Sequence, residues 1–181
     1  MPVIGASTAA IVIQNLQPRD LGDIVALDAK ITGRRREEFF RIKLSQARAD
    51  SGVMVSLAAE TEGALAGFLL SRVFYGEFGA LDAAAVLDTI GVHPAFRGRG
   101  VGRALLAQLR TNLLALGITR LQTEVAWDRQ ELMGFFRREG FIPATRIGLD
   151  LDLEASRRQG MEREAGRDGP SPDSLSNPPR S

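Results

Sequence analysis

Apolar residues recur along the chain at two spacings, one typical of β-strands and one typical of amphipathic helices. Apolar or alternating runs predict strands at residues 10–16, 53–60, 64–74, 86–92, 119–126 and 145–153. Apolar residues three and four positions apart predict helices at residues 20–29, 37–49, 101–116 and 128–139. The predicted order is β-α-α-β-β-β-α-β-α-β, an α/β (α+β) fold with one mixed sheet that carries helices.

Turn and end signals agree with these boundaries. The polar turn Thr61-Glu62-Gly63 joins two strand segments and predicts a hairpin. Pro94 has no amide hydrogen for a sheet ladder, so the strand before it must end there or lie at an edge. Gly117 is a typical left-handed end for the long helix that precedes it. Asp128 and Glu131 have capping-box spacing, which predicts Asp128 as the N-cap of the last helix.

The two ends of the chain differ in composition from the middle. From residue 155 to residue 181 the sequence is rich in Arg, Glu, Gly, Ser and Pro, with Met161 and Leu175 as its large apolar residues. Such a segment cannot bury enough apolar surface to offset its ordering entropy, so it predicts a disordered tail. Residues 1–9 are interpreted as a loose leader. The sequence thus predicts one domain at residues 10–154.

Composition excludes several classes of function. The 181 residues are 44% hydrophobic, which is enough for one domain with a sizeable core. The absence of cysteine and the single histidine, His93, exclude a thiol nucleophile and a Cys- or multi-His-ligated metal. The net charge of +1 and the lack of a long apolar run argue against nucleic-acid and membrane binding. We therefore expect a soluble cytoplasmic protein, with a homodimer left open.

The most informative segment is a glycine- and arginine-rich turn between a strand and the long helix. It reads Arg97-Gly98-Arg99-Gly100-Val101-Gly102-Arg103. Glycines let backbone amides point inward without a Cβ in the way, and such amides form an anion site with the helix N-terminus. The arginines add charge-assisted donors for phosphate oxygens. The segment predicts a pyrophosphate-binding turn; the alternative is a glycine-rich connection with solvated arginines.

Two other phosphate-binding loops fit this turn poorly. A Walker loop ends in Gly-Lys-Ser/Thr, whereas this chain has Gly102-Arg103-Ala104. A dinucleotide fingerprint, G-x-G-x-x-G, needs a third glycine at the position of Arg103 after Gly98 and Gly100. The spacing therefore favours neither class.

The same residues resemble the acetyl-CoA-binding signature of the GNAT N-acetyltransferase superfamily. That signature, Q/R-x-x-G-x-G/A at a helix start, matches Arg97-x-x-Gly100-x-Gly102, which follows the strand end Ile90-Gly91-Val92-His93-Pro94. The segment Phe135-Phe136-x-x-x-Gly140-Phe141 is similar to the family's F-Y-x-x-x-G-F segment. The resemblance extends over the order of elements from Ile11 to Leu153, and it implies a GNAT-like acyl-CoA N-acyltransferase fold.

The resemblance implies where an acetyl-CoA cosubstrate would bind. Amides of the turn from Arg99 to Arg103 would hold the pyrophosphate, and the backbone of Ile90 and Val92 would pair with the pantetheine arm. Asp128 would face that arm, with the N-cap as its alternative role. The implied binding residues are Ile90, Val92, Arg97, Gly98, Arg99, Gly100, Val101, Gly102, Arg103, Asp128 and Phe136.

The implied reaction is attack of a substrate amine on a thioester, which needs a base for the amine proton. Asp88, a carboxylate within an apolar strand, is the first candidate, and Glu124 on the following strand is the second. Each has a structural alternative. Asp88 could face solvent or bond Thr89 or an arginine, and Glu124 could be a salt-bridged strand residue.

Protonation of the departing thiolate is where the sequence departs from the family's pattern. Phe136 stands in place of the family's tyrosine and has no proton to donate. Three alternatives follow. Water or a substrate group protonates the thiolate, or Tyr75, the chain's one tyrosine, takes over the role, or the protein binds acyl-CoA without efficient transfer.

The leading function is transfer of the acetyl group of acetyl-CoA to a primary amine of a small molecule or protein, by direct attack in a ternary complex. The alternatives are a non-catalytic acyl-CoA-binding sensor and a nucleotide-phosphate-binding interaction domain. The run Arg34-Arg35-Arg36 before Glu37-Glu38 is either an acceptor-recognition element or a solvated helix start with an Arg34–Glu38 pair. His93 is interpreted as a strand-end residue, and Trp127 as core or site wall.

Overall fold

The computed structural model describes residues 10–49, 55–75, 83–145 and 148–158. The chain divides after Gly140 into two units, Met1–Gly140 and Phe141–Ser181, and each is described by itself. The predicted leader at residues 1–9 and the tail from residue 159 lie outside the described residues. Within the described part of the chain, no helix is long and apolar enough to cross a membrane.

The first unit is a mixed sheet with helices. Its elements are β1 (Val12–Asn15), the 3-10 turn η1 (Pro18–Asp20), α1 (Leu21–Thr32), α2 (Glu37–Ala49), β2 (Leu57–Thr61), β3 (Ala64–Phe74), β4 (Ala84–Val92), η2 (Pro94–Phe96), α3 (Val101–Ala115), β5 (Leu121–Gln122) and α4 (Gln130–Arg138). The five strands follow the order β1-β2-β3-β4-β5. The pairs β1–β2, β2–β3 and β3–β4 are antiparallel, whereas the pair β4–β5 is parallel. A parallel neighbour needs a crossover, which α3 supplies.

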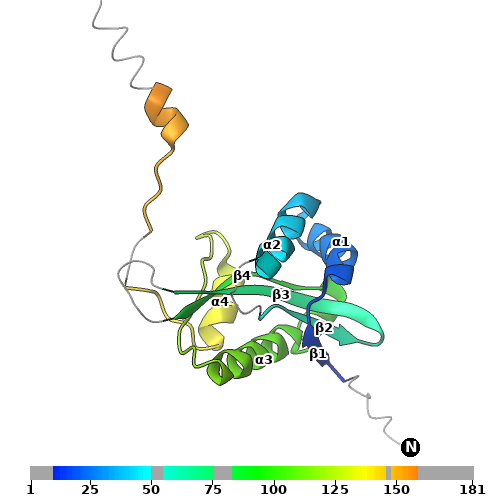
Figure 1. The fold of residues 1–181 in the computed structure, drawn as a ribbon. Helices are drawn as coiled ribbons and strands as arrows, with labels where there is room; N and C mark the ends of the chain where they lie inside the picture. Colours follow the sequence, from blue (N-terminus) through cyan, green and yellow to red (C-terminus); the bar gives the residue numbers. More distant parts are fainter. Residues whose placement is uncertain (1–9, 50–54, 76–82, 146–147, 159–181) are drawn as a thin grey trace, which may run out of the picture. The chain divides into compact units, whose positions relative to one another are not determined.

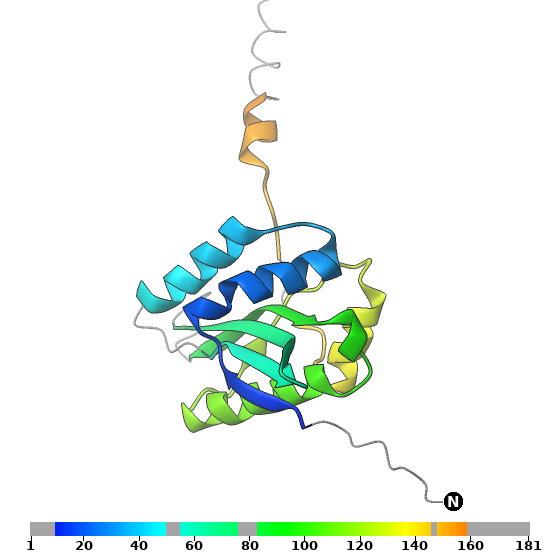
Figure 2. The same cartoon turned by 90° about the vertical axis from the view of Figure 1, so that its right-hand side faces the viewer.

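Helices cover both faces of the sheet. Helices α1 and α2 lie over one face, and α3 and α4 lie over the other (Figure 1 and Figure 2). On the first face, Ile24 and Phe40 pack with Phe68 of β3, and all three side chains are completely buried. On the second face, Leu105 and Leu109 of α3 are equally buried. Burial of a side chain of this size stabilises a fold by about 1.5–3 kcal/mol, so these contacts fix the helices on the sheet.

Most elements form where the apolar pattern predicts them. The helix at residues 37–49 and the strand at residues 64–74 have the predicted bounds. The hairpin turn is present, with left-handed φ angles of 54° at Glu62 and 72° at Gly63. Gly117 ends the α3 segment with a φ of 73°, as its position predicts. The predicted fold class, a mixed α/β sheet with helices, is confirmed.

Two predicted strands are wrong in extent. The strand predicted at residues 119–126 is limited to Leu121–Gln122, because β4 and β5 separate beyond these residues and a separated strand has no ladder. The strand predicted at residues 145–153 does not form among its described residues: 148–152 have no regular structure, and a short helix begins at 153. Alternation of apolar residues produces a strand only when a neighbouring strand supplies the ladder, which the apolar pattern alone does not guarantee.

Residues 153–158 form a short helix, and 155–158 belong to the segment that was predicted as a disordered tail. The Asp152 carboxylate accepts a hydrogen bond from the Ala155 amide at 2.9 Å, which satisfies one of the free amides at the helix start. Leu151 and Leu153 are nonetheless largely exposed.

Helix α4 begins two residues later than predicted. Its N-cap is Arg129, without a side-chain cap, so Asp128 is not the N-cap and the predicted capping box with Glu131 does not form. A turn closed by a 2.9 Å hydrogen bond from the Arg129 amide to the Ala126 carbonyl separates Asp128 from the helix start. Trp127 lies in this turn and is 88% exposed, so its interpretation as a core residue is wrong.

Candidate active site

The sheet opens between β4 and β5. Their ladder ends at Val86 and Gln122, and the Thr123 hydroxyl then donates a hydrogen bond to the Leu87 carbonyl at 2.9 Å. Beyond this contact, residues 88–92 of β4 have no strand on that side among the described residues. Strand β4 therefore has one free backbone edge in its second half.

The register of β4 on β3 shows which backbone groups lie on the free edge. The His93 amide donates to the Ala66 carbonyl at 2.8 Å, and Val92 lies opposite Gly67. Hydrogen-bonded and non-hydrogen-bonded pairs alternate in an antiparallel ladder, so Val92 and Ile90 belong to non-hydrogen-bonded pairs. Their N–H and C=O groups point away from β3, toward the side that β5 has left. An extended ligand can bind there as an additional strand.

A β-bulge places Asp88 at the start of this free edge. The β3–β4 register shifts between Leu70 and Ser71, so Asp88 is the extra residue on β4. Its carboxylate lies 3.3 Å from Lys43 Nζ and 3.8 Å from Arg72 Nε, and its side chain is 19% exposed. The first candidate base is thus already bound by two cations, one from α2 and one from β3.

Glu124 differs from Asp88 in its partners. It follows β5 in the connection to α4, it is exposed, and it lines the same cavity as Asp88. No described residue forms an ion pair or hydrogen bond with its carboxylate, so the salt-bridged alternative is not realised among the described residues. Glu124 is therefore the more available proton acceptor of the two.

The opposite wall of the cavity carries an ion pair between α1 and the start of α2. Arg36 donates from Nε to Asp28 Oδ2 at 2.8 Å and from Nη2 to Asp28 Oδ1 at 2.6 Å. The Asp28 side chain is 3% exposed, and the Arg36 guanidinium lies 5.0 Å from the ring centre of Phe39. The hydrogen bonds that Arg36 donates to Asp28 raise the pKa of Arg36 further, against the opposing effect of burial, so the guanidinium stays charged.

Only one arginine of the run at residues 34–36 reaches the cavity. Arg35 pairs with Glu37 at 3.3 Å on the surface. Glu38 pairs with Arg41, so the predicted Arg34–Glu38 pair does not form. Of the three arginines in the acceptor-recognition hypothesis, Arg36 is therefore the one that remains a candidate, and its hydrogen bonds to Asp28 hold its guanidinium in position.

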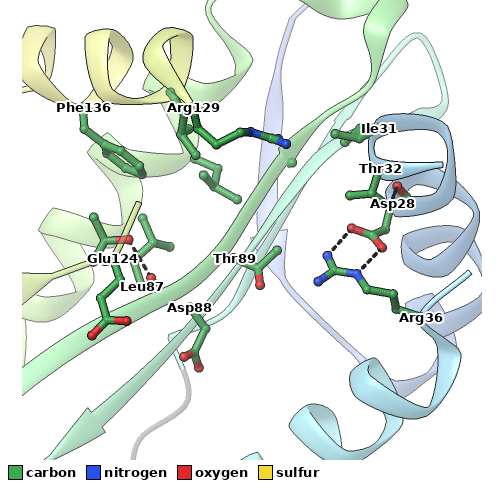
Figure 3. Close-up of a pocket in the computed structure, with 14 residues that line it drawn as sticks. Asp28, Ile31, Thr32, Arg36, Leu87, Asp88, Thr89, Glu124, Arg129 and Phe136 are labelled. Atoms are coloured by element: carbon green, nitrogen blue, oxygen red, sulfur yellow. Dashed lines mark hydrogen bonds and ion pairs between the residues drawn. The ribbon is translucent and has the colours of Figure 1, made fainter. Parts of the chain in front are cut away.

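The cavity between β4, β5, α1 and α4 has a volume of about 180 Å³. Figure 3 shows Thr89 between the Asp28–Arg36 pair on one side and Glu124 on the other. Apolar side chains separate the charged groups. The lining residues are Asp28, Ile31, Thr32, Arg36, Leu87, Asp88, Thr89, Ile90, Gly91, Thr123, Glu124, Arg129, Leu132 and Phe136.

The glycine-rich turn presents free amides at the start of α3. Gly98 and Gly100 have left-handed φ angles of 75° and 85°, which favour glycine. The Ala104 amide donates to the Gly100 carbonyl, whereas none of the described residues accepts from the amides of Gly100, Val101, Gly102 or Arg103. At Gly102 a Cβ would lie 3.2 Å from the Phe135 ring, so α4 packs closely here. The turn has the geometry of an anion site.

The arginines of this turn differ in availability. Arg99 pairs with Glu62 at 3.4 Å, and Arg103 pairs with Glu139 at 3.1 Å. The Glu139 side chain is 8% exposed, so its pair ties α3 to the end of α4. Arg97 has no side-chain partner among the described residues. The backbone amides and Arg97 are thus the groups of the turn that are open to a ligand.

Phe136, which stands in place of the family's tyrosine, and Tyr75, the candidate to replace it, lie apart. Phe136 is buried, packs on Phe135 and lines the cavity. Tyr75 follows the end of β3 beyond the Phe74–Ala84 pair and is 66% exposed. It is not among the lining residues, and it is about four strand residues, roughly 13 Å, from Asp88 along the sheet. The structure does not bring Tyr75 to the cavity.

Several lining residues escaped the sequence analysis. Asp28, Thr89 and Arg129 carry polar groups into the cavity, but no local motif distinguishes them. Asp128, which was predicted to face the site, is not a lining residue. His93 lies at the end of β4, where its Nδ1 accepts from the Ala95 amide at 3.1 Å, in agreement with a strand-end role.

The sequence model of the acetyltransferase (GNAT) family matches residues 23–141. This span is well over half of the chain, and it contains the open edge of β4, the glycine-rich turn and the cavity. The chain belongs to the GNAT acetyltransferase family, which confirms the resemblance noted in the sequence. Membership of this family supports acetyl transfer as the general activity.

Solved structures share the fold. An aminoglycoside N-acetyltransferase, AAC(6')-Iy in complex with CoA, has a TM-score of 0.69 at 16% identity, covering 83% of this chain and 99% of that chain. A ribosomal-protein-alanine N-acetyltransferase from Brucella melitensis biovar Abortus 2308 has a TM-score of 0.65 at 23% identity, covering 80% and 99%. A transcriptional regulator from Bacillus halodurans C-125 has a TM-score of 0.66 at 19% identity, covering 80% and 100%. At these identities the likeness establishes the fold.

Proposed function

We propose that this protein transfers the acetyl group of acetyl-CoA to a primary amine by direct attack in a ternary complex. The observation that carries the proposal is the opening between β4 and β5. Its free backbone edge at Ile90 and Val92 connects the open amides of the turn with the cavity that contains Glu124. A ligand anchored at the turn and laid along this edge would present its far end to the cavity.

Acetyl-CoA is the cosubstrate, and the chain offers groups that suit each part of it. The free amides of residues 100–103 and the Arg97 guanidinium suit a pyrophosphate. The N–H and C=O groups of Ile90 and Val92 suit the amides of a pantetheine arm, which would lie as an added strand. The αL glycines of the turn leave the space above the amides open, since a Cβ at Gly100 would meet no atom within 4 Å.

The reaction joins the amine nitrogen to the thioester carbonyl carbon and breaks the carbon–sulfur bond, so that the sulfur leaves as a thiolate. An alkylamine is an ammonium ion at neutral pH and must lose a proton before attack. We assign this proton to Glu124 because Asp88 is held by Lys43 and Arg72. The Val92 amide is the backbone donor that we assign to the thioester oxygen, where negative charge develops.

Amine-dependent release of thiol tests the proposal. The purified protein is incubated with acetyl-CoA and a panel of primary amines, and free thiol is detected together with the acetylated amine by mass spectrometry. We expect thiol release only when an amine is present. Measurable CoA binding without thiol release above background for any amine would contradict the proposal.

A non-catalytic acyl-CoA sensor is the second candidate, and one observation favours it. Among the described residues, no tyrosine lines the cavity: Phe136 occupies the wall, and Tyr75 lies elsewhere. A thiolate of the CoA type is nevertheless a tolerable leaving group, so water or a substrate group can supply the proton. The missing hydroxyl should therefore slow transfer rather than abolish it.

Phe136→Tyr is expected to raise kcat for amine acetylation by roughly 10-fold, at the weak end of general acid catalysis because the thiolate leaves readily. The new hydroxyl would enter the cavity wall, where it can protonate the sulfur. The matched control is Phe74→Tyr, which adds the same hydroxyl to a half-buried ring at the end of β3 that does not line the cavity. A well-folded Phe136→Tyr variant with unchanged kcat would show that leaving-group protonation does not limit turnover.

A further inference from the structure

Much of the charge around the cavity is already compensated by the protein itself. Asp28 and Arg36 neutralise each other through two hydrogen bonds of 2.6 and 2.8 Å. Asp88 lies against Lys43 and Arg72, which approach it from outside the cavity and are not lining residues. These side chains need no ligand to balance their charge.

Two charged lining residues are left, and they have opposite signs. Glu124 and Arg129 both come from the connection between β5 and α4, and both line the cavity. Neither side chain has an ion-pair or hydrogen-bond partner among the residues that the structure describes. A bound acceptor would meet one free carboxylate and one free guanidinium.

The two free charges lie at different parts of the cavity. Figure 3 shows the Arg129 side chain extending from the start of α4 across the cavity toward Ile31 of α1, whereas Glu124 lies on the β5 side. Apolar lining residues, among them Leu87 and Leu132, accompany the two charged groups. The Thr89 hydroxyl lies between Glu124 and the Asp28–Arg36 pair and has no hydrogen-bond partner among the described residues. The arrangement suits a molecule with two unlike charged ends and a short hydrocarbon segment.

We infer that the acceptor is an aminocarboxylate, a primary amine whose carbon chain also carries a carboxylate. The inference rests on the proposed acetyl transfer at this cavity and names its substrate class. The ammonium end would lie at Glu124, which takes its proton, and the carboxylate would accept hydrogen bonds from the planar donors of Arg129. A polyamine would instead bring a second ammonium to Arg129, where like charges repel. The volume of about 180 Å³ suits a small molecule rather than a large one.

Matched acceptors test this inference. A series of ω-amino acids of increasing chain length is compared with the corresponding ω-amino amides, which keep the amine and the length but lose the negative charge. We expect kcat/KM for the acid of the best length to exceed that of its amide by about 10- to 100-fold, the usual effect of a charge-assisted hydrogen bond. Equal rates for acids and amides would overturn the inference and leave the acetyltransferase proposal intact.

The substitution Arg129→Gln tests whether the Arg129 side chain causes the preference for the acid over its amide. We expect it to raise KM for the preferred aminocarboxylate by about 10- to 100-fold, with KM for its amide and for acetyl-CoA unchanged. Arg137→Gln is the matched control, because Arg137 is an exposed residue of α4, the helix that Arg129 precedes, and does not line the cavity. A rise in KM for acetyl-CoA alone would place Arg129 on the cosubstrate and overturn the inference.

A binding experiment distinguishes failure of this inference from failure of the proposed acetyl transfer. If no amine releases thiol, calorimetry on the CoA-saturated protein measures aminocarboxylate binding directly. Binding that is lost in Arg129→Gln and retained in Arg137→Gln would support the subsite while the acetyltransferase proposal fails. Absence of binding would overturn both.

Discussion

Glu124→Gln is expected to lower kcat/KM for amine acetylation by roughly 10²-fold at neutral pH, which is the lower range for loss of a general base. Glutamine keeps the size and polarity of the side chain but cannot accept the amine proton. Glu124 is exposed and has no partner among the described residues, so the substitution breaks no contact that the structure shows. Thiol release at saturating acetyl-CoA measures the loss, and the affinity for CoA should not change.

The pH profile separates a lost base from a lost contact. Each unit of pH raises the neutral fraction of an alkylamine tenfold while the pH is below its pKa. An amine that arrives neutral needs no base. The ratio of kcat/KM for wild type to kcat/KM for Glu124→Gln should therefore become smaller as the pH rises. A ratio of the two kcat/KM values that stays constant across this pH range would mean that Glu124 binds the acceptor without accepting its proton.

Asp88→Asn is the matched comparison, since it also replaces a carboxylate by an amide in a residue that lines the cavity. The Asp88 carboxylate is bound by Lys43 at 3.3 Å and lies 3.8 Å from Arg72, so its removal should act on local structure more than on proton transfer. We expect a loss in kcat/KM well below that of Glu124→Gln. A larger loss for Asp88→Asn, with intact folding, would reverse the assignment of the base.

Features that depend on neighbours in sequence could be predicted without the structure. The strand end before Pro94, the glycine-rich turn and the helix that follows are specified within about 30 residues, because backbone freedom and apolar spacing act locally. The β2–β3 hairpin follows from its turn residues for the same reason. The position of the free amides at the start of α3 was therefore accessible from the sequence.

Features that depend on contacts between distant residues could not be predicted. The pairing of Asp88 with Lys43 joins residues 45 positions apart, and it decides which carboxylate is available. The length of β5 depends on where β4 and β5 separate, which the apolar pattern of residues 119–126 does not show. No motif distinguishes Arg129 in the sequence. Arg129 stands out only because the other charged lining residues, Glu124 apart, have ion-pair partners within the protein.

Gly100→Glu is expected to weaken CoA binding by about 10²-fold, equivalent to about 2.7 kcal/mol. Gly100 has a φ of 85° and precedes the free amides of α3, and a Cβ there would meet no atom within 4 Å. The new side chain would thus enter the space above the amides rather than the protein core. Its negative charge would repel a pyrophosphate, and part of the loss should diminish at higher salt because exposed charges are screened. Titration calorimetry with CoA measures the effect.

Gly117→Glu separates this repulsion from backbone strain. Gly117 also has a left-handed φ, 73°, and open space around its Cβ position, but it lies at the other end of the α3 segment. Both substitutions should cost about 1–2 kcal/mol of folding stability, because a side chain disfavours this backbone conformation. Only Gly100→Glu should reduce the affinity for CoA. Equal affinity losses in the two variants would attribute the effect to strain, and unchanged affinity in a folded Gly100→Glu variant would mean that the pyrophosphate does not bind at this turn.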